Sequence, residues 1–349
     1  MSTLETNAIG KYSGNNVSVD DALNLKSYDT AGRDALTSVA GDTIYNTTTG
    51  KVEYYNGSAW VATGASSFAI EYLIIAGGGS GGGSAQTGSG GGGAGGYLNS
   101  YASETSGANS STATTFTTYK DTNYTVSVGG GGPSVSGGDV AGSEGTNSFF
   151  DFVVAIGGGS GGARVKDGKG GGSGGGSGAQ VIQDGGNGLP LQGKDGGAVT
   201  TANTPYPGGG GGGASADGGD GTSGGAGAGG NGLSSSITVS AVTRAAGGGG
   251  GNYNGAGASG GTGGGGTGGG NSAPHTGTAG TINTGSGGGG TTNAAASGAG
   301  GSGVVILRWA TADATIGATR TGLVDGNVQT DGSDSYIVFT GGEGDITFS

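Results

Sequence analysis

Glycine is the feature that most constrains this chain: 97 of its 349 residues are Gly, and many stand in runs such as Gly208–Gly213 and Gly255–Gly270. Leu, Ile, Val and Phe together make up about 15% of the sequence, less than the ~20% below which ordinary cores rarely form. Ordering a Gly costs about 1–2 kcal/mol of backbone entropy. One run alone would therefore be a loop, and a folded chain requires many runs to stack together.

The runs favour a stack of polyglycine II helices. Such helices have three residues per turn and no internal hydrogen bonds, so their N–H and C=O groups must pair with neighbouring helices. Only Gly allows that approach on every side. A collagen-like helix is excluded, because the non-Gly residues of Gly168–Gly178 recur every four positions rather than every three. The predicted fold class is all-β with stacked polyglycine II helices, seeded by a small sheet of short strands.

Composition excludes several functional classes. The chain has no Cys, which excludes disulfides, zinc–cysteine sites and thiol catalysis. Its only His is His275, on which any Ser-His-Asp triad would depend. The net charge is −12 and Lys166 with Lys169 is the nearest approach to a basic cluster, so no nucleic-acid partner is expected. We expect no enzyme activity, no cofactor and no metal; the sequence shows neither a membrane span nor a secretory signal, indicating a protein made in a cytoplasm.

Three regions are predicted along the chain: 1–66, 67–310 and 311–349. The first is a β-meander with a hairpin of Asp42–Asn46 and Lys51–Tyr55 and a tight type I′ turn at Asn56-Gly57. In the glycine-rich body, β-branched strands run directly into Gly runs. They are predicted at 68–76, 124–128, 152–156, 237–246 and 301–309. The last region returns to ordinary β composition.

Two segments carry a family resemblance. Ser27–Gly64, with its RDAL, YNTTTGK and YNGSAW pieces, resembles a module of tailed-phage fibre proteins. Glu71–Gly83 together with Gly301–Trp309 resembles the glycine-rich domain of phage fibres and adhesins, and the body is similar in design to T-even-type tip adhesins. The resemblance implies a virion protein of the phage tail, made in the host cytoplasm. It also implies contact with other tail or fibre proteins, and a possible homotrimer.

Several catalytic or ligand motifs are better explained by composition. Repeated GxGxxG matches follow from the Gly content alone. Gly188–Asp195 has the skeleton of a phosphate loop, but Asp195 stands where Ser or Thr should be. Gln183–Leu191 has Pro190 in place of the Asp of a calcium repeat. Asp184, Asp195, Asp217 and Asp220 are interpreted as solvated loop residues rather than as glycosidase carboxylates.

The inserts between Gly runs are the candidate binding surface, chiefly Ala179–Pro207, the NYN segment around Tyr253, and Asn271–Thr284. Exposed aromatic and amide side chains at loop tips suit recognition of saccharides or protein surfaces. The candidate receptor contacts are Tyr206, Asn252, Tyr253, Asn254 and His275. We expect a tail fibre or tip adhesin that binds a host saccharide or outer-membrane protein. A structural filament or decoration protein and an ice- or surface-adsorbing protein are the alternatives.

Overall fold

The computed structural model describes residues 25–63, 67–202, 204–272 and 274–349. The chain forms two compact units, Met1–Ser66 and Ser67–Ser349, which are treated separately below. The described residues are all-β, as predicted: their helices are the short α1 (Thr30–Asp34) and the 3₁₀ turn η1 (Gly107–Asn109).

The first unit contains a four-stranded sheet of order β1-β2-β3-β4. Its strands are β1 (Ser27–Tyr28), β2 (Thr43–Asn46), β3 (Lys51–Tyr55) and β4 (Trp60–Ala62). The predicted hairpin is therefore present. The predicted type I′ turn is wrong, because residues 56–59 connect β3 to β4 and only Gly57, at φ 103°, has positive φ. The Asn56 side-chain oxygen instead accepts the N–H groups of Ser58 and Ala59, both at 2.9 Å.

The second unit is built on a ten-stranded sheet, larger than the small sheet predicted. Its main path is β10-β9-β8-β16-β13-β5-β6, with β7 on β5 and with β14 and β15 on β16. The bounds are β5 Ser67–Ile75, β6 Tyr97–Asn99, β7 Phe116–Tyr119, β8 Asn123–Val128, β9 Ser148–Phe150, β10 Val153–Ala155, β13 Val304–Ala310, β14 Leu323–Asp325, β15 Gln329–Asp331 and β16 Asp334–Thr347. The C-terminal strand β16 lies between β13 and β8, so residues after 310 complete the same sheet.

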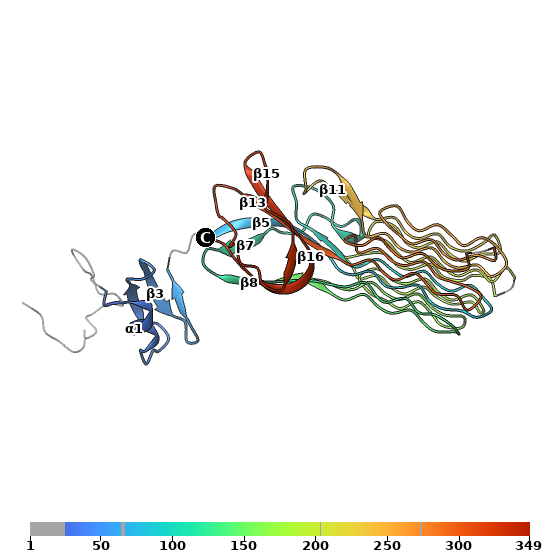
Figure 1. Ribbon diagram of the computed structural model, residues 1–349, viewed down its shortest axis with the longest axis horizontal. Coiled ribbons are helices and arrows are strands. Elements are labelled where there is room, and N and C mark those ends of the chain that lie inside the picture. Colours follow the sequence, from blue (N-terminus) through green and yellow to red (C-terminus); the bar gives the residue numbers. More distant parts are fainter. Residues whose placement is uncertain (1–24, 64–66, 203, 273) are drawn as a thin grey trace, which may run out of the picture. The chain divides into compact units, whose positions relative to one another are not determined.

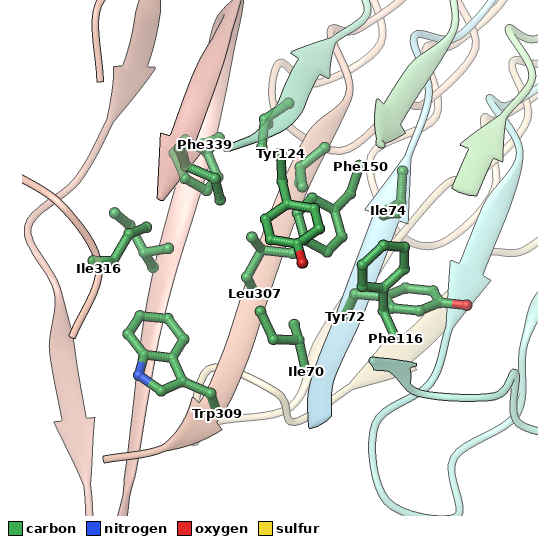
Figure 2. Close-up of a cluster of buried hydrophobic side chains, with 14 of the residues drawn as sticks. Ile70, Tyr72, Ile74, Phe116, Tyr124, Phe150, Leu307, Trp309, Ile316 and Phe339 are labelled. Carbon is green, nitrogen blue, oxygen red and sulfur yellow. The ribbon is translucent and has the colours of Figure 1, made fainter. Parts of the chain in front are cut away.

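An aromatic and aliphatic core packs on this sheet. Phe116, Tyr124 and Phe150 form a cluster with ring centroids 4.7–5.8 Å apart, and Figure 2 shows Tyr124 and Phe150 beside Leu307 of β13. Trp309 is also buried, and its indole N–H donates to Ala314 O at 2.9 Å. The scarce large apolar residues are thus concentrated at the sheet instead of being spread through the chain.

The strand predicted over 237–246 is wrong in extent. The structure has two short strands, β11 (Leu233–Ser235) and β12 (Val242–Arg244), paired antiparallel as a separate hairpin. A turn around Val239, whose φ is 77°, separates them. Ile237 is fully buried in a second core cluster with Ile75 and Ile306, which removes it from the β12 strand.

Glycine-rich tracts leave the sheet, run side by side, and turn back at their far end (Figure 1). Residues 88–96 show how they pair. From Gly88, every third N–H donates to the tract 206–212; from Ser89, every third donates to 285–291; from Gly90, every third donates to 156–162. This recurrence every third residue is the pattern that polyglycine II packing predicts.

The same tract also accepts hydrogen bonds from three further tracts, 76–82, 173–176 and 248–251. It is therefore surrounded by six neighbours, of which 206–212 is parallel to it and the other five are antiparallel. The close approach requires Gly: a Cβ on Gly92 would lie 2.1 Å from the carbonyl oxygen of Gly79. Buried tracts are thus held together by backbone hydrogen bonds where an ordinary domain would use apolar side chains.

Candidate functional site: the loops at the far end of the tracts

Loops from distant parts of the chain meet at the end of the tracts that lies away from the sheet. We call them the tip loops, defined as residues 84–87, 133–140, 163–166, 179–182, 199–206, 222–225, 252–256, 271–276 and 292–297, without 203 and 273. Figure 1 shows the tracts turning back at this end. Each loop is short because it only reverses the direction of a tract.

Hydrogen bonds join successive tip loops into one surface. The N–H of Ala294 donates to Ser84 O (2.8 Å), and Ala85 N–H donates to the Asp139 carboxylate (3.2 Å). Arg164 pairs with that carboxylate at 3.1 Å and accepts the N–H of Gln180 at its own carbonyl. Burial tends to raise the pKa of Asp139, but bonds from Ala85 and Arg164 outweigh it and hold that pKa below its usual value. Asp139 is therefore ionised at neutral pH and connects three loops.

Two loops bring most of the predicted contact residues together. The rings of Tyr206 and Tyr253 meet edge to face with centroids 6.4 Å apart, and both are half-buried. Asn254 is exposed, and its N–H donates to Pro205 O at 3.2 Å. Backbone pairing of Asn252 with Pro207 fixes the two loops to each other. Four of the five predicted residues thus form one cluster.

Asn252 is buried beneath this cluster and is not part of its exposed surface. It is only 3% exposed, and its side-chain oxygen has no hydrogen-bond partner among the described residues. A Cβ on Gly255 would lie 2.6 Å from its side-chain nitrogen. The amide is therefore covered by the following turn, and a ligand would reach Tyr253 and Asn254 first.

His275 lies on the adjacent loop. Its Nδ1 lies 2.7 Å from the carbonyl oxygen of Gly270 and 3.2 Å from the side-chain nitrogen of Asn293. The loop is joined to the Tyr253 loop by the N–H of Asn271, which donates to Gly255 O at 2.8 Å. His275 is half-buried and has no carboxylate among its hydrogen-bond partners. The arrangement orients the ring and gives no sign of a triad.

The inserts named from the sequence are not single loops. Residues 183–188 and 194–199, inside the predicted insert Ala179–Pro207, pair with other tracts. The predicted insert Asn271–Thr284 likewise divides, and Ile282 lies at the sheet end, near the bond from Thr281 N–H to Gly264 O. The sequence reads as loop here because isolated polar and aliphatic residues interrupt the Gly runs.

Four exposed aliphatic side chains on the tip loops were not predicted. Val140, Val165, Val181 and Ile182 are 46%, 54%, 42% and 72% exposed, and they stand on loops joined through Arg164. Exposed aliphatic side chains on a soluble surface mark contact sites when they gather. Val140 and Val165 are single apolar residues in polar segments and Val181 and Ile182 are one short apolar pair, so only the spatial arrangement of the loops reveals that all four stand at the tip.

No group of three or more His, Asp or Glu side chains placed to hold a metal ion occurs in the described part of the chain. Within the same residues, no helix is long and apolar enough to cross a membrane. A cavity of about 670 Å³ lies against β8 and β16, lined by Thr125, Glu343 and Asp345 among others. It contains none of the predicted contact residues.

A family model described as "Glycine-rich domain" matches residues 26–310. The chain belongs to this glycine-rich domain family. The match includes both the four-stranded sheet of the first unit and the tracts that end in the tip loops. Searches of curated proteins and of solved structures find no match.

Proposed function

We propose that the protein is a host-attachment protein of a phage tail, a short fibre or fibre-tip adhesin, and that its tip loops contact the host surface. The observation that carries the proposal is the gathering of the half-buried Tyr206 and Tyr253 and of four exposed aliphatic side chains at one end of the tracts. Surface aromatic and aliphatic side chains held on a rigid scaffold suit recognition.

The tracts support this role mechanically. Because every third N–H of a buried tract is bonded to the same neighbour, the loops are anchored at both ends in an ordered backbone network. Anchored loops lose less conformational entropy when they bind, which favours affinity. Weak contacts of single loops would then gain avidity when several copies on one virion engage a cell together.

The first unit would attach the protein to the tail or join copies into a trimer. Its segment Ser27–Gly64 carries the sequence pieces that resemble tail-fibre modules. Its sheet also leaves Tyr45 and Tyr54 38% and 39% exposed, which gives a partner protein an aromatic surface. A mass measured by light scattering on the full chain distinguishes a trimer from a monomer.

The experiment is binding of the fluorescently labelled full chain to a panel of bacterial strains, measured by flow cytometry. We expect saturable binding to particular strains, reduced at least ~10-fold in the double variant Tyr206→Ala/Tyr253→Ala. The matched control is Leu191→Ala/Ile282→Ala, which removes two exposed side chains at the sheet end of the tracts and should bind like the unchanged chain.

Binding to none of the strains, or equal binding by the tip variant, contradicts the proposal. Assembly of the unchanged chain into open-ended polymers that bind no cells would favour a structural filament instead.

A further inference from the structure

The first unit contains a cavity that the proposed host-attachment role of the tip loops does not use. It has a volume of about 390 Å³, within the range of small-ligand sites. Its walls come from α1, the loop that follows α1, and the connection between β3 and β4. The principal lining residues are Arg33, Asp34, Leu36, Ser38, Tyr55 and Trp60.

Two aromatic rings form one wall of this cavity. Tyr55 and Trp60 are directly paired across the β3–β4 hairpin, with ring centroids 5.6 Å apart and planes inclined at 57°. Both side chains are half-buried and line the cavity. The hydrogen bonds that Asn56 accepts from Ser58 and Ala59 hold the connecting turn and so fix the backbone between the two aromatic residues.

Polar groups also line the cavity. Arg33 donates to Asp34 through Nε at 2.9 Å and Nη2 at 2.7 Å, and through Nη1 to Glu53 at 2.9 Å. The Asp34 side chain remains 58% exposed. The Ser38 hydroxyl is buried and has no hydrogen-bond partner among the described residues. The lining thus offers an exposed carboxylate with unused hydrogen-bonding capacity.

The charge of these polar groups selects against anions. Glu53 is 4% exposed in its side chain and accepts bonds from Arg33, Asn46 and Thr49. Burial tends to raise the pKa of Glu53, but these bonds outweigh it and hold that pKa below its usual value. Glu53 and Asp34 together therefore exceed the single positive charge of Arg33, and a carboxylate or phosphate would meet net negative charge.

We infer that this cavity is a binding site for a neutral saccharide, with Trp60 and Tyr55 stacking on the sugar and Asp34 accepting hydrogen bonds from its hydroxyl groups. A sugar ring presents an apolar C–H face and a rim of hydroxyls, which matches a cavity lined by both aromatic and polar side chains. Arg33, neutralised by its two carboxylates, positions Asp34. The site is distinct from the tip loops and does not depend on them.

The two Trp residues of the chain provide the assay. Trp60 borders the cavity, whereas Trp309 is buried in the core of the second unit. The full chain is screened on an array of neutral and of sialylated oligosaccharides, and the hits are titrated by Trp fluorescence. A neutral oligosaccharide should bind and change the emission. Trp60→Ala should raise its Kd at least ~10-fold, and Asp34→Asn should also weaken it.

The matched control is Tyr54→Ala, which removes a 39%-exposed aromatic residue next to Tyr55 on the same strand but outside the cavity lining. Tyr54→Ala should change Kd less than ~2-fold. A larger change would show that removing any aromatic residue from this sheet disturbs its fold. Circular dichroism of each variant confirms that the unit is folded.

The inference is overturned if no neutral oligosaccharide binds, if binding survives Trp60→Ala, or if only sialylated glycans bind. Neutral-sugar binding that is abolished by Tyr206→Ala/Tyr253→Ala and unaffected by Trp60→Ala also overturns it, while supporting the proposed role of the tip loops. Loss of cell binding in the tip variant with retained Trp60-dependent sugar binding leaves both proposals standing.

Discussion

Replacing one Gly of a buried tract by Ala tests whether close backbone contact holds the second unit together. Gly92 lies in the tract with six neighbours. A Cβ at this position would lie 2.1 Å from Gly79 O and 2.6 Å from the Gly79 carbonyl carbon. Real Cβ atoms are essentially never found within 3.0 Å of another heavy atom. The two tracts would therefore have to separate by about 1 Å at this point.

The cost follows from the bonds that such a displacement disturbs. Gly92 donates to Gly288 O at 2.8 Å and accepts from Gly248 N–H at 2.9 Å, and the neighbouring bond from Gly79 N–H to Gly93 O is 2.9 Å. An added 1 Å takes such bonds beyond the usual range of about 2.7–3.2 Å. Each bond contributes roughly 0.5–1.5 kcal/mol net, and overpacking adds about 1–3 kcal/mol. Gly92→Ala should destabilise the unit by about 3 kcal/mol or more.

Gly130→Ala is the matched control. Gly130 also stands in a Gly run, but it is exposed, has no positive φ, and would place its Cβ 3.9 Å from the nearest atom, Thr146 Oγ1. Without a clash, Gly→Ala restricts the unfolded chain and stabilises by about 0.4–1 kcal/mol. Because both variants make the same Gly→Ala change, a difference in their stability reports the steric clash at Gly92 alone.

Differential scanning calorimetry of the full chain measures both variants on the transition of the Ser67–Ser349 unit. At roughly 2 °C per kcal/mol for a unit of this size, the Tm should fall by at least about 6 °C in Gly92→Ala and stay equal or rise in Gly130→Ala. If the two variants melt within about 1 °C of each other, close packing of the tracts is not what stabilises them, and the reasoning is wrong.

Three further predictions concern single polar contacts. Ser89→Ala removes a buried hydroxyl that donates to Gly82 O and accepts from Thr291 N–H. Calorimetry should show that the free energy of unfolding falls by about 1–3 kcal/mol; an unchanged value would show that the two backbone groups find other partners. Bonds from Arg33 hold the pKa of Glu53 below its usual value, so the ionised carboxylate stabilises the first unit at pH values above the usual Glu pKa, and this stability should be lost as the pH falls through the lowered pKa. Unfolding of the first unit, followed at a series of acid pH values by Trp60 fluorescence, should not show this loss in Glu53→Gln. Arg308→Met leaves Asp331, Asp334 and Ile237 O without the guanidinium that now bonds all three; the expected cost is about 2–3 kcal/mol, and an unchanged Tm would show that the pairs contribute nothing.

The sequence determined the chemistry of the fold. Gly runs long enough to stack, with apolar residues too few for an ordinary core, admit only a backbone-bonded assembly, and the β-branched segments before Gly77 and Gly129 predicted strands that β5 and β8 confirm. These are local properties, because the freedom of Gly and the β preference of branched residues act within a few neighbouring residues.

Tertiary structure decided which tracts are neighbours. The backbone of one Gly run is chemically the same as that of another, so no sequence signal tells that 88–96 lies beside 285–291, or that β16 fits between β13 and β8. The turn at Val239 within the predicted strand 237–246, and the burial of Ile237 beside it, are likewise features of the tertiary structure alone.

The candidate site was predictable in kind but not in arrangement. Aromatic and amide residues between Gly runs indicated Tyr206, Tyr253 and Asn254, but burial of Asn252 and the gathering of Val165 and Ile182 at the tip depend on which loops the stacked tracts bring together. Side-chain identity thus set what the surface could recognise. The position of that surface depends on which tracts pair, and because their backbones are chemically identical, this pairing is fixed only when all the tracts form their hydrogen bonds together.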